Sequence, residues 1–180
     1  MPIDGEQFRR VLGYFATGVT VVTSNDRRSD GTVVPWGTTV NAFSSVSLDP
    51  PLVMIAIGLV RSIHPIIRRE QAFAVNILAE DAQALSDCFA GAPMTPSRAE
   101  FCGAIHHEGA LSVPILDDAV AAFECRLEAT YDAGDHSLFI GRVEAVEDIR
   151  RPALPLLYFR GRYLRIERAA SAELLGKPET

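Results

Sequence analysis

The feature that most constrains the fold is a strict alternation of apolar and polar residues between Phe123 and Tyr131. The apolar positions are Phe123, Cys125, Leu127, Ala129 and Tyr131. A period of two residues predicts a β-strand with one face in the core and the other in water. Residues 132–135 then form a predicted turn into a return strand from Ser137 to Val146, so this part of the chain predicts an antiparallel hairpin.

Short apolar segments separated by turn residues predict most of the remaining chain to be strands. They are Val19 to Thr23, Thr32 to Asn41, Leu52 to Ile57, Phe73 to Leu78, Leu156 to Phe159 and Tyr163 to Ile166. Helices are predicted after the cap residue Asp4, from Ile63 to Glu70 after Ser62, and from Glu80 to Phe89. A mainly β chain with few, flanking helices favours a closed antiparallel barrel over a doubly wound sheet.

One segment places many hydrogen-bonding side chains directly before an apolar strand. These side chains belong to Thr38, Thr39, Asn41, Ser44, Ser45 and Ser47, and Asp49-Pro50-Pro51 ends the segment. Hydroxyls and an amide at this density suit a ligand with phosphate or heteroaromatic edges. A Ser/Thr-rich edge strand followed by a turn is the alternative, and the spacing alone leaves both open.

Size and charge narrow the class of protein. The chain has 180 residues, 48% of them hydrophobic, which is enough for one full core. We expect one domain over residues 1–168, with a C-terminal tail over residues 169–180. A net charge of −6, without a long basic cluster, argues against a nucleic-acid surface.

Nothing in the sequence predicts a membrane segment or a signal peptide. The longest apolar run, Leu52 to Val60, is far shorter than the roughly 20 residues that a membrane helix needs. Asp4 and Glu6 stand where a signal peptide would be basic.

Cys88, Cys102 and Cys125 are odd in number and far apart, which is typical of reduced thiols. We therefore expect a cytoplasmic protein without disulfides.

Several familiar site types are not supported by the sequence. Neither a GxGxxG nor a GxxxxGK[ST] motif occurs, which argues against a Rossmann domain or a P-loop. Cys102, His106 and His107 offer only three metal ligands, two of them adjacent in sequence, which argues against structural zinc. A Ser-His-Asp hydrolase would need Asp135 and His136 in one triad, although they are adjacent and no GxSxG motif is present.

Four patches, in order along the chain, resemble the flavin reductase family. They are FRRVLGYFATGVTVVTS (residues 8–24), AVNIL (74–78), GDHSLFIGRVE (134–144) and YFRGRY (158–163), together with the hydroxyl-rich segment. The resemblance implies an FMN-binding split β-barrel, antiparallel and Greek-key-like, that forms a homodimer. It also implies hydride transfer from NADH or NADPH to FMN or FAD, and a separate flavin-dependent monooxygenase that uses the reduced flavin.

The resemblance also implies which residues contact the flavin. In the flavin reductase family, the flavin lies along the residues that match Asn41, Ala42, Phe43, Ser44, Ser45 and Ser47. Many relatives carry Ser where this chain has Ala42, so only backbone contacts are expected there. An arginine beside a hydroxyl at a helix start, as in Arg61-Ser62, is a suitable phosphate clamp. Arg98 is a second basic candidate near the phosphate.

The family also places the histidine of the GDH motif, here His136, at the nicotinamide side of the flavin. We expect His136 to position the nicotinamide and Asp135 to hold the turn or the imidazole. For Asn76 we favour a buried amide that bridges strands over a flavin contact. Tyr163 is a candidate for either the border of the site or the core.

Two other functions share this architecture. A flavin carrier would bind flavin without reducing it, and the exposed turn at Gly134 with His136 argues against it. Pyridoxamine-phosphate oxidase shares the barrel and FMN, but its chemistry calls for a more basic substrate pocket than this acidic chain suggests.

Overall fold

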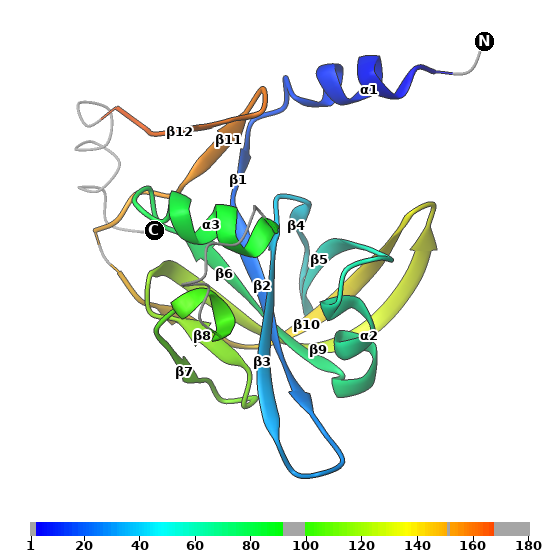
Figure 1. Ribbon diagram of the computed structural model, residues 1–180, viewed down its shortest axis with the longest axis vertical. Helices are drawn as coiled ribbons and strands as arrows, with labels where there is room; N and C mark the ends of the chain where they lie inside the picture. The colour runs from blue at the N-terminus through cyan, green and yellow to red at the C-terminus, as the bar shows by residue number, and fades with distance from the viewer. Residues whose placement is uncertain (1–2, 92–99, 151, 168–180) are drawn as a thin grey trace.

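The computed structural model describes residues 3–91, 100–150 and 152–167. At its centre is a seven-stranded antiparallel sheet with the strand order β3-β2-β6-β9-β10-β5-β4 (Figure 1). These strands are β2 (Thr20–Arg27), β3 (Val33–Val40), β4 (Phe43–Leu48), β5 (Pro51–Gly58), β6 (Ala72–Leu78), β9 (Ala119–Ala133) and β10 (His136–Asp148). Two small sheets flank it, formed by β1 (Thr17–Gly18), β11 (Leu157–Phe159) and β12 (Arg162–Leu164), and by β7 (His106–Glu108) and β8 (Pro114–Leu116).

The connection between β3 and β4 explains why the large sheet is curved. These two strands are the opposite edges of the sheet, yet only residues 41 and 42 separate them in sequence. The edges of a flat seven-stranded sheet would lie about 29 Å apart, at about 4.8 Å per strand. The short link from Val40 to Phe43 spans at most about 11 Å. The sheet therefore has to roll up until its two edges meet near residues 41 and 42.

The rolled sheet is a split barrel. In the described part of the chain, no ladder pairs β3 with β4, and the backbone N–H of Ala56 on β5 instead donates to the carbonyl of Ala42, at 3.0 Å. The prediction of a mainly β antiparallel fold with flanking helices is confirmed, and so is the split β-barrel that the family resemblance implies. The closed barrel favoured by the strand pattern alone is wrong. Alternation within single strands gives no information on whether two distant edges pair.

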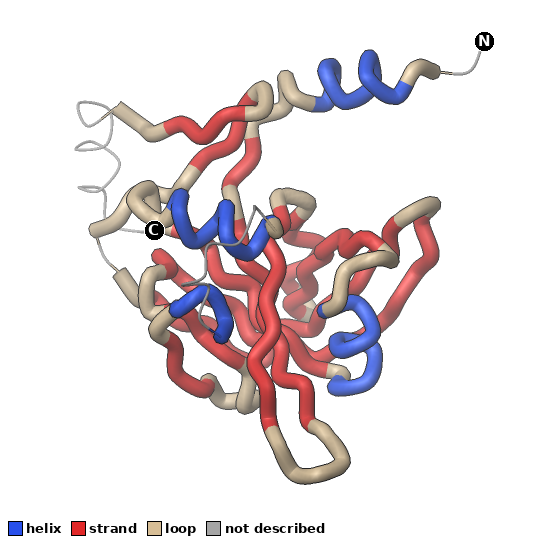
Figure 2. Tube along the Cα trace, in the orientation of Figure 1, coloured by secondary structure: helices blue, strands red, loops and turns tan. Residues whose placement is uncertain are grey.

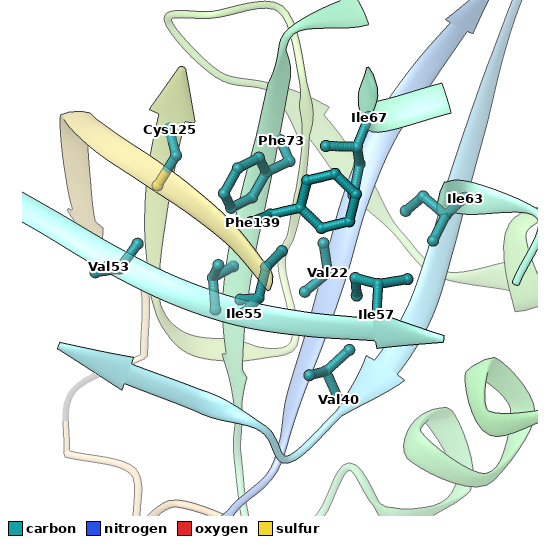
Figure 3. Close-up of a cluster of buried hydrophobic side chains, with 11 residues drawn as sticks. Val22, Val40, Val53, Ile55, Ile57, Ile63, Ile67, Phe73, Cys125 and Phe139 are labelled. Atoms are coloured by element: carbon teal, nitrogen blue, oxygen red, sulfur yellow. The ribbon is translucent and has the colours of Figure 1, made fainter. Parts of the chain in front are cut away.

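The core lies inside the roll and beneath helix α2 (Ile63–Glu70) (Figure 3). Its main cluster consists of Val22, Val40, Val53, Ile55, Ile57, Ile63, Ile67, Phe73, Val75, Cys125 and Phe139. Alternate residues of β5, namely Val53, Ile55 and Ile57, are buried, as the period of a strand requires. Burial on this scale supplies most of the stability of the barrel.

The alternation on β9 predicts its faces only in part. Cys125 is fully buried as expected, but Glu124, predicted to face water, is also buried. Its carboxylate accepts hydrogen bonds from the backbone N–H groups of Ala110 and Leu111, at 2.9 and 2.7 Å. The small β7–β8 sheet, which the sequence pattern did not reveal, precedes β9 and brings these donors to Glu124.

Three α-helices and one 3₁₀ helix, η1 (Glu100–Gly103), accompany the sheets in the described residues (Figure 2). Helix α3 (Gln83–Ala90) packs closely on β3, because a Cβ atom at Gly37 would lie only 2.6 Å from Cε1 of Phe89. Helix α1 (Gly5–Leu12) is capped by the Asp4 carboxylate as predicted, at 3.3 Å from the backbone N of Glu6.

Helix α1 projects away from the barrel (Figure 1). It has eight residues, and none of them is buried. Its apolar face, defined here by Phe8, Val11, Leu12 and the following Phe15, is exposed in the single chain. This face thus remains without a partner among the described residues.

Two of the three cysteines differ from expectation. Cys88 at the end of α3 and Cys102 in η1 form a disulfide, so the prediction that all three are reduced thiols is wrong. Sequence spacing could not reveal this pair, because the fold brings the Cα atoms of residues 14 positions apart to 6.1 Å. Cys125 is a buried free thiol. Within the described ranges, no helix is both long enough and apolar enough to span a membrane.

Candidate functional site

The split of the barrel contains a cavity of about 190 Å³. It is lined by residues 38–42 from β3 and its link to β4, by residues 56–58 from β5, and by Arg61 and His136. The cavity thus lies where the two edges of the sheet approach each other. Thr38, Thr39 and Asn41, from the first half of the hydroxyl-rich segment, border this cavity.

Strand β3 offers backbone hydrogen-bonding groups to this cavity. Among the described strands it pairs with β2 alone, so alternate residues direct their N–H and C=O groups away from that neighbour. The Thr39 hydroxyl is already used, because it donates to the carbonyl of Ser86 on α3 at 2.6 Å. The free strand edge, more than the hydroxyls, is therefore suited to the hydrogen-bonding edge of a heteroaromatic ring.

Arg61 and Ser62 lie at the N-terminus of α2, next to the end of β5. The backbone N–H of Arg61 donates to the carbonyl of Gly58 at 3.0 Å, and its Nη1 donates to the carbonyl of Ala90 at 3.2 Å. Ser62 is the N-cap residue, yet its hydroxyl makes no cap hydrogen bond. A helix N-terminus, an arginine and an uncommitted hydroxyl together suit a phosphate group.

His136 is the first residue of β10 and is half exposed, at 46% of its side chain. Its Nδ1 lies 2.7 Å from Oδ1 of Asp135. That hydrogen bond with His136 holds the pKa of Asp135 below its usual value. Asp135 therefore stays ionised and fixes the orientation of the imidazole, while Nε2 remains directed to the cavity side.

Gly58 brings Arg61 and His136 together. A Cβ atom built at Gly58 would lie 3.7 Å from Nε2 of His136 and 3.8 Å from Cγ of Arg61. From the sequence we expected Arg61 to bind the phosphate and His136 to position the nicotinamide, and nothing in the sequence predicted that the two side chains are neighbours. Two nitrogen-rich groups beside one glycine make this end of the cavity suitable for an anionic ligand.

Two further cavities adjoin the first, and Asn41 lines all three. One has about 720 Å³ and a mainly apolar lining that includes Phe15, Phe43 and Met54. The other has about 200 Å³ and is bordered by Tyr158 and Tyr163. The three cavities surround the short β3–β4 link, which makes Asn41 the most central of the predicted site residues.

The predicted serines are less central. Ser44, Ser45 and Ser47 lie on the edge strand β4, and none of them lines these three cavities. The Ser44 hydroxyl donates to the carbonyl of Ser45 at 3.0 Å. Arg98 lies outside the described residues. Sequence reasoning also missed Gly58 and Ala56, since small apolar residues carry no signal for a site.

Two residues left open by the sequence are now placed. Asn76 is fully buried, and its Nδ2 donates to the carbonyl of Val21 and to Thr23, each at 3.0 Å. Its Oδ1 accepts from the backbone N–H of Leu116 at 2.9 Å, so Asn76 bridges strands as favoured. The Tyr163 hydroxyl donates to Asp87 at 2.8 Å and borders the cavity of about 200 Å³, so Tyr163 combines both suggested positions.

The residues of the possible zinc site have other partners. Cys102 is bonded to Cys88, and His107 lies between Asp117 and Glu147, at 2.9 and 3.1 Å. The described residues contain no group of three or more potential ligands placed to hold a metal ion.

Comparison with known proteins identifies the family of this chain. The flavin reductase like domain model matches residues 12–167. The reductase subunit HsaB of a flavin-dependent monooxygenase from Rhodococcus jostii is 40% identical over 165 residues, covering 92% of this chain and 80% of the relative. An NADH-dependent flavin reductase from a Rhodococcus species is 38% identical over 173 residues, covering 95% and 88%.

Solved structures give the same result. The NADH:FAD oxidoreductase SgcE6 of Streptomyces globisporus superposes with a TM-score of 0.81 at 34% identity, covering 93% of this chain and 96% of that one. The flavin reductase of styrene monooxygenase from Pseudomonas putida superposes with a TM-score of 0.73 at 35% identity, covering 87% and 95%. The chain therefore belongs to the flavin reductase like domain family.

Proposed function

We propose that this protein is an NADH-dependent flavin reductase that supplies reduced flavin to a separate monooxygenase. The observation that carries the proposal is the cavity in the split of the barrel. It combines a free strand edge on β3 with Arg61 and His136 in a chain of this family, and Ser62 follows Arg61 at the start of α2.

The names of the relatives support the choice of reductant and partner. Three relatives that are 38% to 39% identical to this chain are NADH-dependent reductases, and the one from Pseudomonas fluorescens is 39% identical. Others are reductase components of monooxygenases, including one that acts on 4-nitrophenol in Rhodococcus opacus. We infer that NADH is preferred over NADPH, and that the oxygenase is a separate protein.

The chain offers suitable groups for each part of FMN or FAD. The free edge of β3, with Asn41 and the backbone of Ala42, suits the pyrimidine edge of the isoalloxazine ring. Phe43, in the adjoining apolar cavity, suits the ring's dimethylbenzene end. Arg61 and Ser62 suit the phosphate.

When bound, the flavin supplies the hydride acceptor for NADH. The protein then has to hold the nicotinamide in the orientation for direct transfer. We assign this positioning to His136, whose imidazole is fixed by Asp135 and is half exposed beside the cavity. Neither side chain has to exchange a proton in this step.

We further propose a homodimer, with the apolar face of α1 at the contact between the two copies. Phe8, Val11, Leu12 and Phe15 are each at least half exposed in the single chain, and water-exposed apolar stripes of this kind are typical of interfaces. The cytoplasmic location stays a prediction from the sequence.

The proposal is tested by steady-state assays that combine FMN or FAD with NADH or NADPH, each in the presence of EDTA. We expect NADH oxidation that depends on added flavin and is insensitive to EDTA. Activity that disappears with EDTA and returns with zinc would refute the proposal. Flavin binding without NADH oxidation would instead identify a flavin carrier.

A further inference from the structure

Arg61 and His136 come from elements far apart in sequence, and their own side chains do not join them. Arg61 donates to Ala90, and His136 is held by Asp135. Their common neighbour Gly58 has no side chain with which to fix their separation. The backbone ladder pairs Gly58 with His136, so it places the start of the Arg61 turn. The position of α2, which follows Arg61, depends in addition on how that helix is attached to β10.

A buried hydrogen bond makes that attachment. Nε2 of His64 on α2 lies 2.9 Å from Oγ of Ser137 on β10. His64 is only 8% exposed and Ser137 is fully buried. The backbone N–H of His64 donates to the carbonyl of Arg61 at 2.9 Å, while Ser137 directly follows His136. His64 is thus linked to Arg61, and Ser137 is linked to His136.

The alternation of β10 explains why this pair escapes notice in the sequence. His136 and Ser137 are consecutive, so their side chains point to opposite faces of the strand. His136 is on the exposed side, and Ser137 is directed inward to α2. The residue that follows the GDH motif is therefore a buried serine, which contacts α2 and not the cavity.

The pair is well held on both sides. The Ser137 hydroxyl donates to Oδ1 of Asp132 at 3.5 Å, and a carboxylate only accepts hydrogen bonds. Nε2 of His64 and the Ser137 hydroxyl share one hydrogen bond at 2.9 Å, in which the tautomer of His64 decides the donor. The His64 ring also packs edge-on against Phe139, with the ring centres 5.2 Å apart. Burial lowers the pKa of His64, which favours the neutral form of the ring.

We propose that His64 and Ser137 are positioning residues that fix the separation of Arg61 from His136, and thereby align flavin with nicotinamide. The inference rests on the proposed function, and it assigns to two buried residues a role in ligand geometry. Neither side chain lines the cavity, so neither is expected to contact a ligand.

Ser137→Ala tests the proposal, with Ser24→Ala as the matched control. Ser24 is also a fully buried strand serine, and its hydroxyl donates to the carbonyl of Ala72 at 2.8 Å, but it does not line the cavity. We expect both variants to lower Tm to a similar extent. Only Ser137→Ala should weaken FMN binding and raise KM for NADH, each by about three- to tenfold, which is the effect of one neutral hydrogen bond.

His64→Gln is the second variant, and it applies if Ser137→Ala does not fold. The glutamine amide retains an N–H donor for Ser137, so we expect FMN affinity and NADH KM closer to wild type than in His64→Leu. Adding His64→Leu to Ser137→Ala should cause little further loss, because both changes remove the same bond. Equal losses in His64→Gln and His64→Leu would count against the hydrogen bond.

FMN affinity is measured by fluorescence titration without NADH, so it does not depend on turnover. A wild type that binds FMN but does not oxidise NADH would refute the reductase while the titration still tests the pair. If Ser137→Ala lowers Tm as Ser24→Ala does but leaves FMN affinity and NADH KM unchanged, the positioning role is refuted and the bond only stabilises the fold.

Discussion

Gly58 and His136 face each other across the β5–β10 ladder, and the site of a Cβ atom on Gly58 lies 3.7 Å from Nε2 of His136. This distance is ordinary van der Waals contact, so Gly58→Ala should not disturb the fold. The methyl group would nevertheless occupy part of a cavity of about 190 Å³ between His136 and Arg61. We expect weaker flavin binding with a free energy of unfolding within about 0.5 kcal/mol of wild type.

Fluorescence titration with FMN and thermal unfolding measure these two quantities. Gly5→Ala is the matched control, because a Cβ atom at Gly5 has no neighbour within 4 Å and lies outside the cavity. Unchanged FMN affinity in Gly58→Ala would mean that the ligand does not occupy this end of the split.

Arg61→Ala tests the proposed phosphate clamp. A hydrogen bond to a charged group contributes about 1.5 to 3 kcal/mol, so FMN affinity should fall by roughly ten- to a hundredfold. Riboflavin has no phosphate, and its affinity should change little. The measurement is titration of both ligands into wild type, Arg61→Ala and the control Arg28→Ala, whose side chain pairs with Asp26 in the β2–β3 hairpin. Equal losses for FMN and riboflavin would assign Arg61 a role in folding alone.

His136→Ala tests the positioning of the nicotinamide. Orientation effects reach roughly 7 to 11 kcal/mol in the best cases, and a single contact supplies a fraction of that. We expect a higher KM for NADH or slower turnover, with FMN affinity within a few-fold of wild type. Because His136 lies beside Arg61, its loss could instead affect the binding of the flavin phosphate. A selective loss of FMN over riboflavin affinity would place His136 at the phosphate instead.

The fold was largely predictable because it depends on local patterns. The alternation from Phe123 to Tyr131 and the apolar segments matching β5 and β6 lie within observed strands. The open edge was not predictable, because it depends on whether β3 and β4 pair across the whole sheet. The burial of Glu124 and the Cys88–Cys102 disulfide were missed for the same reason. Each depends on contacts between segments that sequence spacing does not reveal.

The candidate site was predictable where its residues carry polar chemistry or, as at Ala42, match the flavin segment of the family. Asn41, Arg61 and His136 all line one cavity, as a shared ligand requires. Gly58 and Ala56 were missed, because they contribute space to the cavity and have no functional group that a sequence pattern could reveal. Ser137 was missed because its importance follows from its buried contact with His64, which only the packing of α2 on β10 creates.

Phe8→Asp tests the proposed homodimer. Phe8 belongs to the exposed apolar face of α1 and is 53% exposed within one chain, outside the buried core, so the change should leave the barrel folded. We expect the wild type to have twice the chain mass of 19.6 kDa in analytical ultracentrifugation, and Phe8→Asp to shift it to the monomer. The control Arg10→Ala changes the polar face of the same helix. A monomeric wild type would contradict the proposal.

The most direct test of the reductase itself is rapid anaerobic mixing of the flavin-loaded protein with NADH, followed by the visible absorbance of the flavin. Without oxygen, reduced flavin cannot be reoxidised, so hydride transfer appears as loss of the yellow colour. We predict that this absorbance disappears within seconds, and more slowly in His136→Ala. An absorbance that stays unchanged over the same period would contradict the assignment and identify a flavin-binding protein without reductase activity.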